Sequence, residues 1–215
     1  MGAMIRYARS HRAFAVCLSA LAGYVDAIGF MALGGFFVSF MSGNSTRFSV
    51  GLARRSPDAM VAGGLIACFV FGVVLGSAVG RFAGRRRPTV ILILVSGLLA
   101  CGSSLAIAGS NAAALSLVAM AMGAENTIFE REGEVSVGVT YMTGTLVKLG
   151  QRAAGALFGE DRLGWLPYLV LWLGLVGGAF VGAVCYRWMG LQALWIGAAA
   201  ALGLALIGAR LDPAA

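Results

Sequence analysis

Six apolar stretches divide the chain, and polar residues are largely confined to the intervals between them. At a rise of 1.5 Å per residue, helices of roughly 18–22 residues extend about 27–33 Å, which matches the hydrocarbon core of a bilayer. The stretches cover residues 13–33, 59–80, 89–109, 112–129, 165–186 and 191–209. The pattern predicts an all-α membrane protein with six transmembrane helices.

Two further segments, residues 35–53 and 135–156, are moderately apolar but are broken by Gly, Ser, Thr and a cation. Irregular backbone at membrane depth is tolerated only where protein buries it or where it lines a wet cavity. We expect each segment to enter the membrane as a half-helix and to return to the same side. This arrangement keeps the arginine cluster at 81–87 on the cytoplasmic side with both termini, as the positive-inside rule favours.

The two halves of the chain resemble each other at an offset of about 101 residues. Residues 38–47 match 139–148, and most of the ten aligned pairs are identical or chemically similar. The match resumes at two sets of glycines, which are Gly72, Gly76 and Gly80 in the first half and Gly174, Gly178 and Gly182 in the second. Because each half holds three predicted spans, an odd number, residues 1–110 and 111–215 are predicted to form two inverted repeats within one membrane domain.

Composition supports a lipid environment and argues against several functional classes. Hydrophobic residues make up 60% of the chain and charged residues 12%, with a mean hydropathy of +0.88. The net charge of +7 is typical of cytoplasmic loops that meet anionic lipid, and no basic stripe interleaved with aromatic residues indicates nucleic acid. No hydrolase, metal-site or P-loop motif is present, so we expect no enzyme activity, no cofactor and no metal.

Asp26 lies midway along the first predicted helix. A charge near the bilayer centre is disfavoured by at least about 2.5–3.5 kcal/mol, so it needs a partner or a path to water. Asp26 therefore either contacts a solute, cation or proton, or holds helices together, for instance by pairing with Arg47. Arg47 and Lys148 occupy equivalent repeat positions, where they attract an anion, pair with Asp26 and Glu125, or extend to the membrane interfaces.

The two broken segments and their flanking polar residues make up the predicted solute pathway, near the midplane where transporter sites are common. Its residues are Asp26, Phe40, Gly43, Asn44, Arg47, Asn126, Tyr141, Gly144, Thr145 and Lys148. The two glycine sets recur every four residues and are predicted to be packing faces. They serve either within one chain or between two copies in a homodimer.

The stretches GYVDAIGF at residues 23–30 and FMSGNST at 40–46, with YMTGT at 141–145, resemble the YoaK-type family of small bacterial inner-membrane proteins. The resemblance covers nearly the whole chain. It implies a similar fold of about six spans in the bacterial inner membrane and a small permease, a description that goes with a domain of unknown function. It implies no substrate and no catalytic residue.

We therefore predict a small permease that moves a small polar or charged solute, with its site between the two broken segments. An ion or small-molecule channel of the same architecture is one alternative. A non-transporting membrane scaffold that dimerises through its glycine faces is another.

Overall fold

The computed structural model describes residues 9–131, 134–135 and 140–210, and in these residues all regular structure is helical except for one short hairpin. The α-helices are α1 (Arg9–Ala32), α2 (Met41–Arg54), α3 (Asp58–Ala83), α4 (Arg87–Ile107), α5 (Asn111–Glu125), α6 (Met142–Leu157), α7 (Leu166–Met189) and α8 (Leu194–Gly208). The remaining elements are the 3₁₀ turns η2 (Gly84–Arg86) and η3 (Gly190–Ala193) and the antiparallel strands β1 (Glu130–Arg131) and β2 (Glu134–Val135). Val139, where the predicted repeat match begins in the second half, lies outside the described residues.

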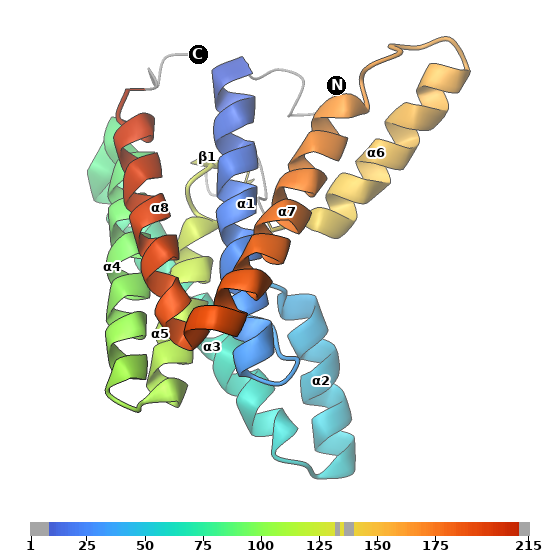
Figure 1. Cartoon of the computed structure of the whole chain (residues 1–215). Helices are drawn as coiled ribbons and strands as arrows, with labels where there is room; N and C mark the ends of the chain where they lie inside the picture. Colours follow the sequence, from blue (N-terminus) through green and yellow to red (C-terminus); the bar gives the residue numbers. More distant parts are fainter. Residues whose placement is uncertain (1–8, 132–133, 136–139, 211–215) are drawn as a thin grey trace.

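Each of the six predicted apolar stretches is helical, and four segments are long and apolar enough to cross a membrane. These are Arg12–Ala32, Asp58–Ala83, Arg87–Ile107 and Leu166–Gly208. The last contains both α7 and α8, which fold back on each other at the turn η3 (Figure 1). The six predicted spans thus correspond to four candidate spans by length and composition, together with the shorter apolar helix α5.

Helix α5 ends earlier than the predicted range of 112–129. The backbone N–H groups of Thr127 and Ile128 bond to the third preceding carbonyl, which is 3₁₀ geometry. The Asn126 and Thr127 side chains also bond to carbonyls of the last turn, those of Met122 and Ala124. These competing local bonds end the helix at 15 residues, or about 22 Å.

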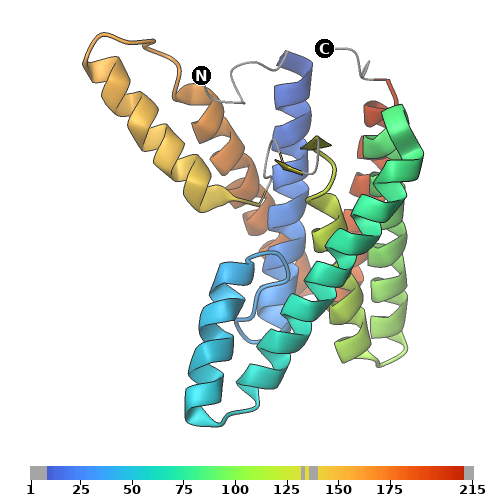
Figure 2. The same cartoon turned by 180° about the vertical axis from the view of Figure 1, so that it is seen from behind.

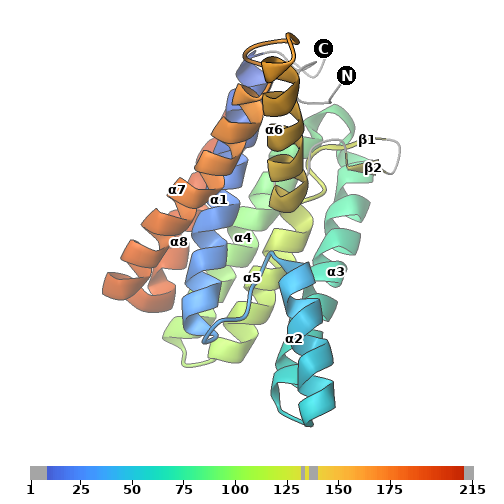
Figure 3. The same ribbon diagram turned by 90° about the vertical axis from the view of Figure 1, so that its right-hand side faces the viewer.

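Helices α1, α3, α4, α5, α7 and α8 run roughly alongside one another, and α2 and α6 lie on one side of them (Figures 1 and 2). Helix α6 lies toward the end of the molecule where α1 begins and α8 ends, whereas α2 lies toward the opposite end (Figure 3). Both are short, with 14 and 16 residues. The segments predicted to be broken are therefore short helices preceded by non-helical backbone.

Two helix pairs, α1 with α7 and α3 with α5, bring backbone against backbone through glycines. A Cβ added at Gly178 would collide with the carbonyl of Ala20, and one at Gly72 would collide with that of Met120. The predicted glycine faces therefore contact helices of the same chain. Glycine has no side chain, so the two helix backbones can approach closely. Dispersion contacts between them then stabilise the pair, because lipid supplies no hydrophobic driving force for helix association.

Large apolar side chains cover much of the outer surface. Phe71 on α3 is 57% exposed, Phe180 on α7 is 71% exposed and Leu206 on α8 is 64% exposed. A soluble protein rarely exposes so continuous an apolar surface, and lipid contact accounts for it.

The glycine contact between α7 and α1 can be tested by adding one methyl group. Gly178→Ala should lower the melting temperature by several degrees, because overpacking costs about 1–3 kcal/mol and each kcal/mol shifts Tm by about 2–4 °C in a chain of this size. Gly177→Ala is the matched control, since nothing lies within 4 Å of a Cβ at that position. It should leave Tm unchanged or raise it. Equal effects of the two variants on tryptophan-monitored melting in detergent would contradict this packing.

Candidate solute site

The non-helical segment at residues 33–40 reverses the chain and lies back against α1. Gly34 and Gly35 have φ of 63° and 106°, left-handed conformations that glycine adopts without strain. A Cβ at Gly29 would lie 2.6 Å from the Val38 side chain, so the returning chain packs directly on the α1 backbone. This reversal places the start of α2 beside the middle of the bundle rather than at its end.

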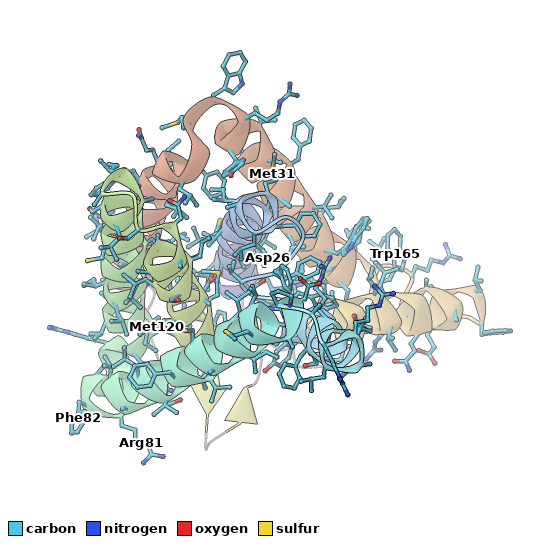
Figure 4. All side chains as sticks on the ribbon, turned by 90° about the horizontal axis from the view of Figure 1, so that it is seen from below. Asp26, Met31, Arg81, Phe82, Met120 and Trp165 are labelled. Atoms are coloured by element: carbon cyan, nitrogen blue, oxygen red, sulfur yellow. The ribbon has the colours of Figure 1, made fainter. Side chains whose placement is uncertain are left out.

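The Asp26 carboxylate holds this segment to α1. Its Oδ1 accepts hydrogen bonds from the backbone N–H groups of Val38, at 2.9 Å, and Ser39, at 2.8 Å. Viewed from below, Asp26 lies near the middle of the molecule, whereas Arg81 and Phe82 project from its periphery (Figure 4). Lipid cannot hydrate these two N–H groups, so the carboxylate satisfies donors that would otherwise stay unpaired.

Asn44 and Arg47 of α2 also contact the non-helical segment at residues 33–40. The fully buried Asn44 amide accepts from the N–H of Phe37 at 3.1 Å and donates to its carbonyl at 2.6 Å. The Arg47 guanidinium lies 4.7 Å from the ring centroid of Phe36, a cation–π contact. Asp26 bonds to the backbone instead, so the predicted alternative in which Arg47 pairs with Asp26 is not formed.

The second half has a related but looser arrangement before α6. Asn126, at the end of α5, accepts a hydrogen bond of 2.8 Å from the Thr140 hydroxyl. Thr145 is buried and bonds to the Tyr141 carbonyl, whereas Gly144 and Lys148 are exposed. Asn126 thus lies in the place of Asp26 and holds the chain before α6 through the Thr140 hydroxyl.

A cavity of about 330 Å³ lies where the N-terminal turns of α2 and α6 meet. It is lined by Ser39, Phe40, Met41, Ser42, Phe69, Thr140, Tyr141, Met142, Thr143 and Gly144. Of the predicted pathway residues, Phe40, Tyr141 and Gly144 are in this lining. The other seven lie outside it, where Asp26, Asn44 and Asn126 hold the backbone that leads into it. Ser42 and Thr143 line the cavity and were not singled out, although both belong to the repeated motif.

Neither short helix has a side-chain hydrogen bond capping its N-terminus. The N-cap residues are Phe40 and Tyr141, whose side chains offer no suitable acceptor. The first N–H groups of a helix lack intrahelical partners, and its dipole places positive potential there. Both helices therefore direct positive ends toward one cavity that has no charged side chain in its lining.

Glu125, which the sequence indicated only as a possible partner of Lys148, is fully buried. Among the described residues, neither of its carboxyl oxygens has a hydrogen-bond partner. The sequence around it, at the end of an apolar helix, gives no sign of this isolation. No group of three or more metal-ligating side chains comes together in the part of the chain that the structure describes.

The anchoring role of Asp26 predicts an ordered series of variants. Asp26→Ala should lower stability by about 1–3 kcal/mol, because it leaves two buried N–H groups unpaired. Asp26→Asn retains an acceptor oxygen and should lose clearly less. Melting temperatures in detergent test this order. Equal loss in both variants would show that the charge, rather than the accepting oxygen, is what the fold requires.

Comparison with known proteins places these features in a family. The family model described as "Protein of unknown function (DUF1275)" matches residues 14–207. The chain is 40% identical to the UPF0700 transmembrane protein RA0705 of Rhizobium meliloti (strain 1021), over 88% of this chain and 82% of the relative. It is 29% identical to the UPF0700 transmembrane protein YoaK of Bacillus subtilis (strain 168), over 66% of each chain.

No solved structure matches the chain. The relatives are bacterial transmembrane proteins, which agrees with the apolar helices and lipid-facing surface described above. The chain therefore belongs to the DUF1275 family, which includes the UPF0700 transmembrane proteins.

Proposed function

We propose that this protein is a small permease of the bacterial inner membrane and that its solute binds between the first turns of α2 and α6. The observation that carries the proposal is the single cavity lined by the repeated motif from both halves of the chain. Transporters built from repeats commonly bind solutes between discontinuous helices near the midplane.

The cavity favours a small solute that carries oxygen acceptors or negative charge. Its volume of about 330 Å³ is at the lower end of the range for small-molecule sites. Ser42, Thr140 and Thr143 bring hydroxyl-bearing side chains to the wall, and two uncapped helix ends supply positive potential. Phe40 and Tyr141 add an apolar wall.

The proposal includes two inverted repeats with three spans each. Helix α1 packs on α7 through Gly178 and the carbonyl of Ala20, and α5 packs on α3 through Gly72 and the carbonyl of Met120. The first span of each half thus packs on the second span of the other half. This exchange is what an inverted pair of three-helix units would produce.

The ends of α3 and α7 also correspond to each other, although the residues that match are further apart along the chain than in the sequence repeat. Gly84 (φ 52°) follows α3 and Gly190 (φ 58°) follows α7, and each is continued by a 3₁₀ turn. Arg81 and Arg187 lie in the last turns of α3 and α7. These pairs are 106 residues apart, as are Gly72 and Gly178. We therefore align α7 with α3 four residues, or about one helical turn, beyond the match between Gly72 and Gly174 that the sequence indicated.

We place both termini in the cytoplasm. The start of α1, the junction of α3 with α4 and the end of α8 lie at one end of the molecule (Figure 1). The described cations at this end include Arg12, Arg81, Arg86, Arg87 and Arg210, whereas Arg54, Arg55 and Arg187 are at the opposite end. The larger cluster of cations favours the first end as the cytoplasmic side.

A channel of the same architecture is the second candidate, because two opposed helix ends can also form a selective pore. A scaffold that dimerises through its glycine faces has less support, since Gly72 and Gly178 are already covered by helices of the same chain. Saturation of the flux with solute concentration distinguishes a permease from a channel.

Filling the cavity should stop the flux without unfolding the protein. Nothing lies within 4 Å of a Cβ at Gly144 or at Gly150, and both lie on α6, but only Gly144 lines the cavity. In proteoliposomes we expect Gly144→Phe to lower the permeation rate at least about tenfold, a transition-state difference of about 1.4 kcal/mol. Gly150→Phe should retain the rate.

The assay is light-scattering liposome swelling with a panel of chloride, nitrate, sulfate, urea, glycerol and glycine. At least one solute should enter wild-type proteoliposomes faster than empty liposomes. Equal permeation through the Gly144→Phe and Gly150→Phe variants would contradict a pathway through this cavity. No entry of any panel solute above empty liposomes would count against transport of these classes.

A further inference from the structure

Glu125 is a buried carboxyl group with no partner among the residues that the structure describes. Its side chain is fully buried at the C-terminal end of α5, and both oxygens lack a hydrogen-bond partner among the described residues. An isolated buried carboxylate is strongly disfavoured, and such a group normally binds a proton instead.

No charged group on the neighbouring helices compensates Glu125. Helix α5 packs on α3 and α4 and touches α1. The described charged side chains on these helices are Asp58 and Arg81 of α3, Arg87 of α4, and Arg12 and Asp26 of α1. Asp26 bonds to the α2 segment, and Arg87 donates through Nε to the Thr127 carbonyl at 3.0 Å.

Two residues near Glu125, Asn126 and Gly123, are connected to the cavity wall. Asn126 accepts the hydrogen bond of Thr140, which lines the cavity. Gly123 packs against the carbonyl of Phe69, another lining residue. In two views, α5 ends at the level where α6 begins (Figures 1 and 3). A change in charge at Glu125 thus acts directly on the elements that form the cavity.

We propose that Glu125 is the proton-binding site of this protein and that its proton moves together with the solute. This inference rests on the proposed permease function. The carboxylate takes up one proton from one side of the membrane and releases it to the other, with no change in oxidation state. Neutral Glu125 is compatible with the buried position, and its ionised form would require water or a cation to reach it.

The first experiment needs no solute. Ionising Glu125 places an unpaired charge in the folded protein, whereas water solvates the same charge in the unfolded chain, so ionisation lowers the stability of the folded state. The wild-type protein should therefore lose stability as the pH rises above about 4.3, which is the ordinary pKa of a glutamate in an unfolded chain. Glu125→Gln, which mimics the protonated form, lacks this loss.

We expect the melting temperature of Glu125→Gln minus that of the wild type to grow by roughly 3–5 °C per pH unit, starting from pH 5. Glu160→Gln, which changes an exposed carboxyl group, is the matched control and should show no such trend. A difference that does not change with pH would overturn proton binding at Glu125, whatever the flux measurements give.

The second experiment measures coupling. Proteoliposomes containing trapped pyranine receive each panel solute, and the change in internal pH is recorded. Solute-dependent proton movement should be at least about tenfold slower in Glu125→Gln than in the wild type and unchanged in Glu160→Gln. Equal rates in all three proteins would overturn coupling through Glu125.

The two experiments separate the two proposals. A pH-dependent melting difference without any solute flux in the wild type would leave Glu125 as a proton site and remove its role in a permease for these solutes. Solute flux through the cavity with no pH-dependent melting difference would retain the permease and remove the proton site.

Discussion

The rest of this structure depends on one constraint, which is that every backbone N–H and C=O group must find a hydrogen-bond partner within the protein because lipid offers none. A helix satisfies its own N–H and C=O groups, so departures from helical geometry inside the bilayer need protein partners. Residues 33–40 are such a departure, and they are held by the Asp26 carboxylate and the Asn44 amide. In the second half, Asn126 holds Thr140 before α6. These polar groups make it possible for two helices to begin inside the molecule.

Close helix packing makes this arrangement rigid enough to hold a cavity. Gly178 lets α7 lie on α1, which carries Asp26, and Gly72 lets α3 lie on α5, which carries Asn126. The helices that hold the two broken segments are thus fixed by the glycine contacts. Packing and site are linked because the same two helices, α1 and α5, take part in both.

Sequence periodicity predicted the six apolar helices and the two short ones, because burial in lipid leaves a strong compositional pattern. It extended α5 too far, since competition from the Asn126 and Thr127 side chains depends on local geometry. It also made Arg47 a candidate partner for Asp26, although Phe36 takes the guanidinium. Contacts between residues far apart in sequence, such as those around Glu125, leave no local signal.

The difference between Asp26 and Asn126 makes the electrostatics of the cavity unequal on its two sides. Asp26 bonds to Val38 and Ser39, two and three residues before α2 begins, so its negative charge lies beside the positive end of that helix. Asn126 is neutral, so it places no negative charge beside the start of α6. Arg47 on α2 and exposed Lys148 on α6 occupy equivalent positions, so the cations on the two sides match and the difference comes from Asp26. On the proposed function, an anionic solute would therefore be attracted more strongly toward the start of α6, the helix that follows Glu125 along the chain, than toward the start of α2. If Glu125 binds the proton as proposed, the half of the molecule that attracts the anion is also the half that holds this acid, and neutral Glu125 does not repel the negative charge in the cavity.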